Sequence, residues 1–217
     1  MSGIDSRLAP RPPTAGNSTG RLAARNPLST RCVRPGALAY RFAPGPRLNQ
    51  LLDRLRDTRG WGQIIGPHGS GKSTLLHTLW PALGSAGFEP LGFVLRDGQR
   101  RLPAGWRREA AGGCGQRRLL VLDGYEQLSW LARWNLQRTC RRRGWGLLIT
   151  AHQPQGLPML YRTRTTPPLA QALVQHLLAD QPLALPAAEI DASFHRHRGN
   201  LRTMFGELFD RYEELRG

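Results

Sequence analysis

The sequence is almost without lysine. Lys72 is the only lysine among its 31 lysines and arginines, and only 15 residues are acidic. The formal net charge is therefore +16 and the sequence pI is about 11.5, a balance that attracts polyanions. The 25 glycines, 17 prolines and many arginines are also typical of a GC-rich genome, in which arginine becomes the default surface charge. Charge alone therefore leaves nucleic-acid binding open.

Cysteine is equally scarce, and long hydrophobic runs are absent. Cys32, Cys114 and Cys140 are odd in number and scattered, which excludes a disulfide framework and fits no zinc-site spacing. No apolar run approaches the roughly 18 residues that a membrane helix needs, and the polar start has no apolar core of a secretory signal. We therefore expect a cytoplasmic protein with reduced thiols and no membrane partner.

What is present is an alternation of strand-like and helical segments. The 217 residues, 40% of them hydrophobic, suit one sizeable domain with a packed core. Short apolar runs alternate with helical periods, which predicts an α/β fold with a parallel sheet of about five strands and helices on both faces. The expected strands cover residues 61–65, 90–95, 119–124, 145–151 and a segment near 159–165.

Composition shifts suggest three parts. Residues 1–40, rich in proline and glycine, predict a disordered or extended N-terminal arm. Residues 41–167 hold the expected sheet, and residues 168–217 hold three consecutive helices that predict a small lid-like subdomain. Within the sheet region, residues 96–118 show no clear period and predict an exposed loop that is rich in glycine and arginine.

One segment, "IIGPHGSGKSTLL", carries a phosphate-binding pattern. It matches G-x-x-x-x-G-K-[ST] between an expected strand and an expected helix, which is the context that the motif requires. The loop must curve so that backbone N–H groups point at a phosphate, and the start of the helix adds its dipole. The expected nucleotide-binding residues are Gly66, Pro67, His68, Gly69, Ser70, Gly71, Lys72, Ser73 and Thr74.

The lone lysine lies within this motif. Lys72 must reach the β- and γ-phosphates as a compact point charge, a task for which the bulkier planar guanidinium is unsuited. The hydroxyl of Ser73 suits Mg²⁺. This chain uses arginine for positive charges that need no particular geometry, and it uses lysine where the geometry requires a compact ammonium group.

A second segment, "RRLLVLDGYEQL", ends an apolar strand with acidic residues. Asp123 at the strand end is a candidate Mg²⁺ residue, and Glu126 is a candidate general base for an attacking water molecule. A plainer interpretation is also open: Asp123 would begin a tight Asp-Gly turn, and Glu126 would complement a helix dipole.

These two motifs resemble the additional-strand class of P-loop NTPases, and the helical tail makes the chain similar to AAA+ and STAND ATPases over roughly residues 45–215. In the STAND pattern Asp123, Gly124 and Glu126 match, while Gln127 replaces the second acid. The resemblance implies a sensor-1 role for Thr150, with His152 as another candidate for that role. It also implies a sensor-2 role for Arg202 in "GNLR".

The chain also departs from the AAA+ pattern. The segment after the fourth expected strand has no room for the helix that usually presents an arginine finger, and nothing singles out Arg162 or Arg164 as its substitute. Ring assembly is therefore not expected. The ABC signature "LSGGQ" is absent, and a guanine-reading [NT]-K-x-D motif would need a second lysine. The expected cofactors are accordingly ATP and Mg²⁺.

Three functions fit these motifs. The first is Mg²⁺-dependent ATP hydrolysis by Lys72, Asp123, Glu126 and Thr150. The second is a nucleotide-dependent binding switch with little hydrolysis, acting on DNA, RNA or a protein partner. The third is a small-molecule kinase, which ranks last because the sequence shows no acceptor motif.

Overall fold

The computed structural model describes residues 26–42, 47–112 and 115–216. Residues 1–25, the greater part of the expected N-terminal arm, lie outside this range, as does Cys114. The described residues form two compact units. The first contains the sheet, with residues 47–66 and 76–162, and the second contains residues 26–42, 67–75 and 163–216.

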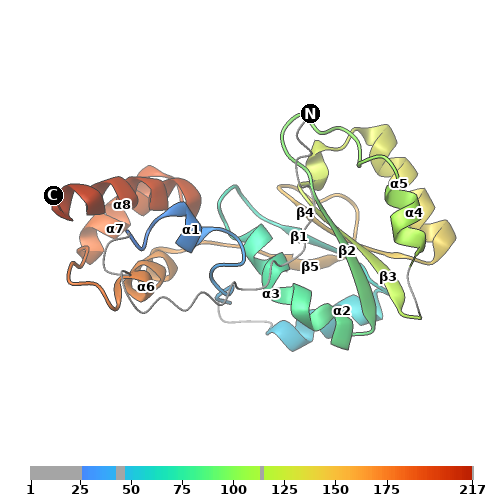
Figure 1. The fold of residues 1–217 in the computed structure, drawn as a ribbon, viewed down its shortest axis with the longest axis horizontal. Helices are drawn as coiled ribbons and strands as arrows, with labels where there is room; N and C mark the ends of the chain where they lie inside the picture. Colours follow the sequence, from blue (N-terminus) through green and yellow to red (C-terminus); the bar gives the residue numbers. More distant parts are fainter. Residues whose placement is uncertain (1–25, 43–46, 113–114, 217) are drawn as a thin grey trace. The chain divides into compact units, whose positions relative to one another are not determined.

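Five parallel strands form the sheet of the first unit, in the order β2-β3-β4-β1-β5 (Figure 1). Every pairing between neighbouring strands is parallel, which confirms the predicted α/β class. The strands are β1 (Trp61–Ile65), β2 (Phe88–Val94), β3 (Arg117–Asp123), β4 (Gly146–Ala151) and β5 (Met159–Arg162). Strand β4 therefore lies between β1 and β3.

Helices cover both faces of this sheet, as Figure 1 shows. Helices α2 (Leu48–Asp57) and α3 (Lys72–Ser85) lie on one face, and α4 (Trp106–Ala111) and α5 (Trp130–Arg143) lie on the other. Along β4, Leu147 and Ile149 join the α4–α5 cluster, while Leu148 faces the side of α2. Because alternate residues meet different helix layers, the central strands must be apolar at every position.

The segment expected to be an exposed loop, residues 96–118, contains the helix α4. Trp106 is 9% exposed and Ala110 is 1% exposed, so the two residues one helical turn apart face the core. The surrounding arginines and glycines hide this short pattern in the sequence. The second strand also begins earlier than predicted, at Phe88 instead of Pro90.

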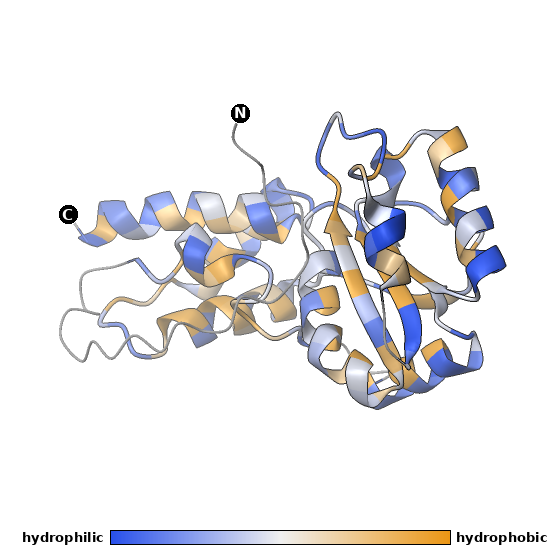
Figure 2. Cartoon of the chain, turned by 45° about the vertical axis from the view of Figure 1, so that its right-hand side comes forward, coloured by the Kyte–Doolittle hydropathy of each residue, from blue (hydrophilic) through white to orange (hydrophobic). Residues whose placement is uncertain are grey.

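Three helices make up most of the second unit: α6 (Pro167–Leu178), α7 (Ala187–Arg196) and α8 (Leu201–Arg216). Their hydrophobic sides, visible along α8 in Figure 2, form a core that includes Val174, Ile190 and Met204, each fully buried. Among the described helices, none has the length and apolar character that crossing a membrane requires.

Residues 26–42 also belong to this helical core, which differs from the extended arm expected there. They include the short helix α1 (Thr30–Val33), and Leu28 is buried among residues of α6, α7 and α8. The side-chain amide of Asn26 donates to the carbonyl oxygen of Phe209 at 2.9 Å. Only a few apolar residues anchor this segment, too few to produce a period in the sequence.

We predict that Gly146→Ala destabilises the sheet. A Cβ atom on Gly146 would lie 2.9 Å from Cα of Gly60 and 2.8 Å from a side-chain carbon of Leu119, so the strands would have to separate. The expected loss is about 1–3 kcal/mol in the free energy of unfolding, measured by denaturant titration. As a control, Gly206→Ala within α8 meets no atom within 4 Å and should raise stability by about 0.5–1 kcal/mol. Unchanged stability of Gly146→Ala would contradict this close packing.

Candidate functional site

The candidate phosphate-binding motif, residues 66–74, forms a loop between β1 and the first turn of α3, which we call the phosphate loop. Its first residue, Gly66, follows β1 and donates its N–H to the carbonyl oxygen of Ala151 at 3.2 Å. Gly69 and Gly71 have φ values of +68° and +89°, a backbone conformation that residues with a side chain rarely adopt. The loop then enters α3 at Lys72. The glycines that the motif predicts therefore lie where the backbone needs them.

Lys72 bends back across this loop. Its Nζ donates to the carbonyl oxygen of Pro67 at 2.8 Å, and the residue is only 9% exposed. The hydroxyl of Ser70 also donates to that carbonyl, at 2.8 Å, and lies 2.6 Å from the hydroxyl of Thr163. Pro67 and His68 are exposed, while Ser73 and Thr74 on α3 are half-buried. The side chains of Lys72 and Ser70 therefore hold the loop together through the Pro67 carbonyl. Thr163, which the sequence did not single out, adds a contact from outside the loop.

Asn200, the residue that caps α8, packs against the same loop. A Cβ atom on Gly69 would lie only 1.8 Å from the Oδ1 atom of Asn200, so the fit requires glycine. That oxygen accepts the N–H of Arg202 at 3.1 Å and of Thr203 at 3.4 Å. Arg202 itself is exposed on the first turn of α8. The "GNLR" segment thus touches the phosphate loop through its asparagine, whereas the sequence pointed to its arginine.

Tyr40 lies on another side of the loop. A Cβ atom on Gly71 would lie 3.1 Å from the Cε2 atom of Tyr40, and the ring makes an edge contact with Phe42 at 5.1 Å between centroids. Sequence analysis did not single out Tyr40, because aromatic residues without a helical or strand period in a segment rich in proline and glycine give no local signal.

Asp123 and Thr150 form a pair in the sheet unit. Asp123 ends β3, and the Oγ1 atom of Thr150 near the end of β4 donates to its Oδ1 atom at 2.5 Å. The same hydroxyl accepts the N–H of Gly124 at 2.9 Å. Thr150 is 1% exposed, so its hydroxyl is fully engaged in orienting the carboxylate of Asp123. The resemblance implied a sensor role for Thr150, which stays a prediction, and the observed contacts of its hydroxyl are with Asp123 and Gly124.

His77 lies near this carboxylate. Burial lowers the pKa of His77 from its ordinary value, and the negative charge of Asp123 opposes that shift. The imidazole on α3 is therefore kept neutral near neutral pH and does not neutralise Asp123. The sequence did not indicate this neighbour, because it depends on how α3 packs on the sheet.

Glu126 is held by His152. It lies in the short 3₁₀ turn η2 (Tyr125–Gln127), and its Oε1 atom is 2.9 Å from Nε2 of His152. The Nδ1 atom of His152 is 3.2 Å from the carbonyl oxygen of Gly66. The two ring nitrogens of His152 therefore face a carboxylate on one side and a backbone carbonyl on the other. The imidazole therefore joins the candidate base to the first residue of the phosphate loop.

The second oxygen of Glu126, Oε2, is buried and has no hydrogen-bond partner among the described residues. With Oε1 paired to His152, the carboxylate is not placed to accept a proton from water. A buried carboxylate oxygen without a protein partner is costly, and it leaves an acceptor open to water or a ligand.

Arg133 on α5 fixes the backbone of this turn. Its Nη2 atom donates to the carbonyl oxygen of Glu126 at 2.6 Å, and its Nε atom donates to that of Leu128 at 2.8 Å. Its Nη1 atom donates to Oε1 of Gln155 at 2.8 Å. One arginine among many carries no signal in the sequence, although here a single guanidinium holds three acceptors from two loops.

The candidate site suits a Mg²⁺ ion that is bound together with nucleotide phosphates. Among the described residues, no group of three or more His, Cys, Asp and Glu side chains could hold a metal ion alone. Mg²⁺ is usually held by one or two carboxylates together with water and substrate phosphates. The oriented carboxylate of Asp123 suits a Mg²⁺ ion that a phosphate would also ligate.

Comparison with known proteins shows which solved structures have a similar fold. No protein-family model matches the sequence, and a search of curated proteins found no relative. Among solved structures, the chain is similar to the replication initiator DnaA bound to AMPPCP and single-stranded DNA, with a TM-score of 0.53 and 15% identity over 77% of this chain. AMPPCP-bound DnaA from Aquifex aeolicus gives the same TM-score and identity over 82% of this chain.

The matched regions cover 61% and 64% of those DnaA chains, so this chain spans less than two thirds of their length. At 15% identity the likeness concerns the fold alone, a parallel α/β sheet followed by helices.

Proposed function

We propose that the protein binds ATP and hydrolyses it with Mg²⁺, as a short AAA+-like member of the additional-strand class of P-loop NTPases. The observation that carries this proposal is the phosphate loop. Two glycines in left-handed conformations curve it, and the only lysine of the chain lies across it, nine-tenths buried. A mostly buried ammonium group beside a glycine-rich turn that opens a helix is suited to an anionic phosphate.

The strand order supports the proposed class. Strand β4 pairs with β1 on one side and β3 on the other, so it separates the strand that leads into the phosphate loop from the strand that ends in Asp123. The carboxyl ends of parallel strands lie at one edge of a sheet, where ligands of open α/β sheets bind. Gly66, Asp123 and Thr150 all lie at that edge.

Each residue would then have a distinct role. The loop amides and Lys72 would bind the phosphates and offset the charge that develops on the transferred group. Ser73 and Asp123 would hold Mg²⁺, which neutralises phosphate charge when bound, and Thr150 would keep the carboxylate of Asp123 oriented. Arg202, two residues after the asparagine that touches Gly69, would approach the nucleotide from α8.

Glu126 would be the general base, and its pairing with His152 defines the resting arrangement. To accept a proton from water, its carboxylate must leave the imidazole, while Arg133 continues to hold the backbone of the turn. The His152 ring also contacts Gly66. A change in the phosphate loop on nucleotide binding would therefore reach Glu126 directly through this ring.

A second candidate is a nucleotide-dependent switch that binds single-stranded DNA with little hydrolysis. The net charge of +16 favours a polyanionic partner, and the similar DnaA structure is a complex with single-stranded DNA. ATP turnover measured with and without a DNA strand distinguishes the two candidates, because the switch predicts ATP-dependent DNA retention without appreciable phosphate release.

We predict that Lys72→Ala abolishes binding of Mg-ATP, because the loop loses its only positive charge. Lys72→Arg should fail as well, since the guanidinium does not fit a loop closed over the Pro67 carbonyl. Isothermal titration calorimetry measures both, with Arg142→Ala as a control that leaves affinity unchanged. Wild-type affinity in Lys72→Ala would overturn the proposed function.

We predict that Glu126→Gln retains ATP binding and loses turnover by about 10²–10⁴-fold, because the amide cannot accept a proton. Phosphate release measures turnover, and chromatography of labelled product separates free phosphate from a phosphorylated acceptor, which a small-molecule kinase would give. Hydrolysis at the wild-type rate in Glu126→Gln would show that the base lies elsewhere.

We predict that Thr150→Val raises the Mg²⁺ concentration needed for half-maximal turnover by about tenfold or more, because Asp123 loses the hydroxyl that orients it. Valine has nearly the same shape, so the fold should persist. ATP affinity measured without Mg²⁺ should stay unchanged, and a shift in that affinity instead would argue against a role through the metal.

A further inference from the structure

Helix α5 exposes large apolar side chains. Trp130 is 73% exposed, Leu131 is 58% exposed and Trp134 is 55% exposed. Trp130 and Trp134 are one helical turn apart, so they lie on one side of the helix. Contiguous exposure of this kind marks interaction sites, and tryptophan is enriched among the residues that dominate binding energy.

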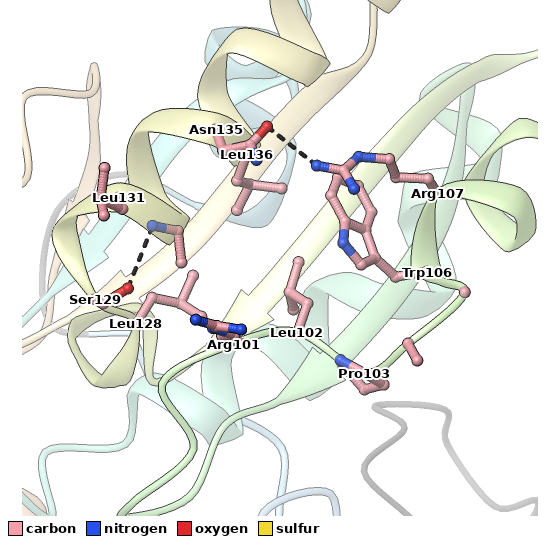
Figure 3. Close-up of a pocket in the computed structure, with 13 residues that line it drawn as sticks. Arg101, Leu102, Pro103, Trp106, Arg107, Leu128, Ser129, Leu131, Asn135 and Leu136 are labelled. Atoms are coloured by element: carbon pink, nitrogen blue, oxygen red, sulfur yellow. Dashed lines mark hydrogen bonds between the residues drawn. The ribbon is translucent and has the colours of Figure 1, made fainter.

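A trough of about 450 Å³ opens beside these residues, between α5 and the segment that leads into α4 (Figure 3). Its walls are mostly apolar, and in Figure 3 the side chains of Leu102, Leu128 and Leu136 lie around it. We call Trp130, Leu131, Trp134 and this trough the α5 surface. Leu131 belongs to both parts, so the exposed side chains and the trough are continuous.

Two polar side chains of the trough, Ser129 and Asn135, are paired with neighbouring groups of the trough itself. The hydroxyl of Ser129 accepts the N–H of Ala132 at 3.3 Å, and Oδ1 of Asn135 accepts from Nη2 of Arg107 at 3.0 Å (dashed in Figure 3). A small-molecule site usually has several polar groups that converge on the ligand. The α5 surface instead offers apolar area that extends past the trough, which suits a protein segment.

Arginines dominate the charge on α5 and in the lining of the trough. Helix α5 contains five arginines and no acidic residue, and Arg101 and Arg107 line the trough. Among the described residues that line it, none is acidic. An occupant that complements this surface therefore carries carboxylates beside its apolar residues.

The aliphatic walls of the trough, as distinct from the exposed ring of Trp130, favour protein over nucleic acid. Leucine and proline side chains form much of the lining and offer no flat face on which a base could stack. The guanidinium groups of Arg107 and Arg138 already lie over the rings of Trp106 and Trp134, at 4.9 Å and 5.2 Å from the ring centroids. The surface also consists of helices and a loop, so a partner cannot join it as an added strand.

We propose that the α5 surface docks an acidic amphipathic helix of a partner protein. Apolar residues of that helix, spaced at i, i+3, i+4 and i+7, fill the trough and contact Trp130 and Trp134. Its carboxylates lie beside the arginines. This interaction is independent of the proposed nucleotide chemistry.

A display library of random peptides of about four helical turns, panned against the full chain, tests the proposal. Enriched peptides should share the apolar helical spacing and a net negative charge. Fluorescence anisotropy should then show about tenfold weaker binding to the double variant Trp130→Ala and Trp134→Ala, and to Leu131→Glu, which adds a repelling carboxylate.

Leu215→Ala, which alters an exposed leucine on α8, is the matched control and should bind normally. Circular dichroism and ATP turnover should be unchanged in all these variants, because none of the substituted residues contacts the phosphate loop or Asp123. No enrichment over the Leu131→Glu protein, or enriched peptides that are basic or lack the spacing, would overturn the proposal. Loss of oligo(dT) binding in the double variant, with peptide binding intact, would assign the surface to nucleic acid and overturn it too.

Discussion

The position of strand β4 between β1 and β3 determines where the candidate catalytic groups of the sheet lie. Its end supplies Thr150 to the carboxylate of Asp123, and two residues later His152 reaches both Glu126 and Gly66. These contacts exist only because the register of three parallel strands brings their carboxyl ends level. Moving β4 to an edge of the sheet would separate the loop from the acidic residues while leaving every local motif intact.

The sequence predicted what depends on local pattern. Strands β3 and β4 are continuous apolar runs because both faces are covered, and the helices of the second unit show long periods. It did not predict α4, where only Trp106 and Ala110 reveal a buried side. The N-terminal segment gave no sign that Leu28 would enter a helical core.

In the candidate site, the contacts between residues that are far apart in the sequence could not be predicted. The glycines of the loop follow from the backbone conformation that the motif needs, but the contact of Asn200 with Gly69 depends on tertiary packing alone. The same holds for the bond between Ser70 and Thr163 and for the three acceptors of Arg133. Thr150 was singled out as a polar strand end, yet its partner became visible only in the fold.

This chain is an unusual target for amine-selective reagents. The ε-amino group of Lys72 is the only side-chain amine in the sequence. Acylation there would remove the charge and replace the ammonium group that bonds to Pro67 with a bulkier neutral amide. Elsewhere, arginine keeps its charge under the same reagents. A reagent selective for amines would therefore act on the side chains of this protein at one place only, and occupancy of the phosphate loop would shield that place.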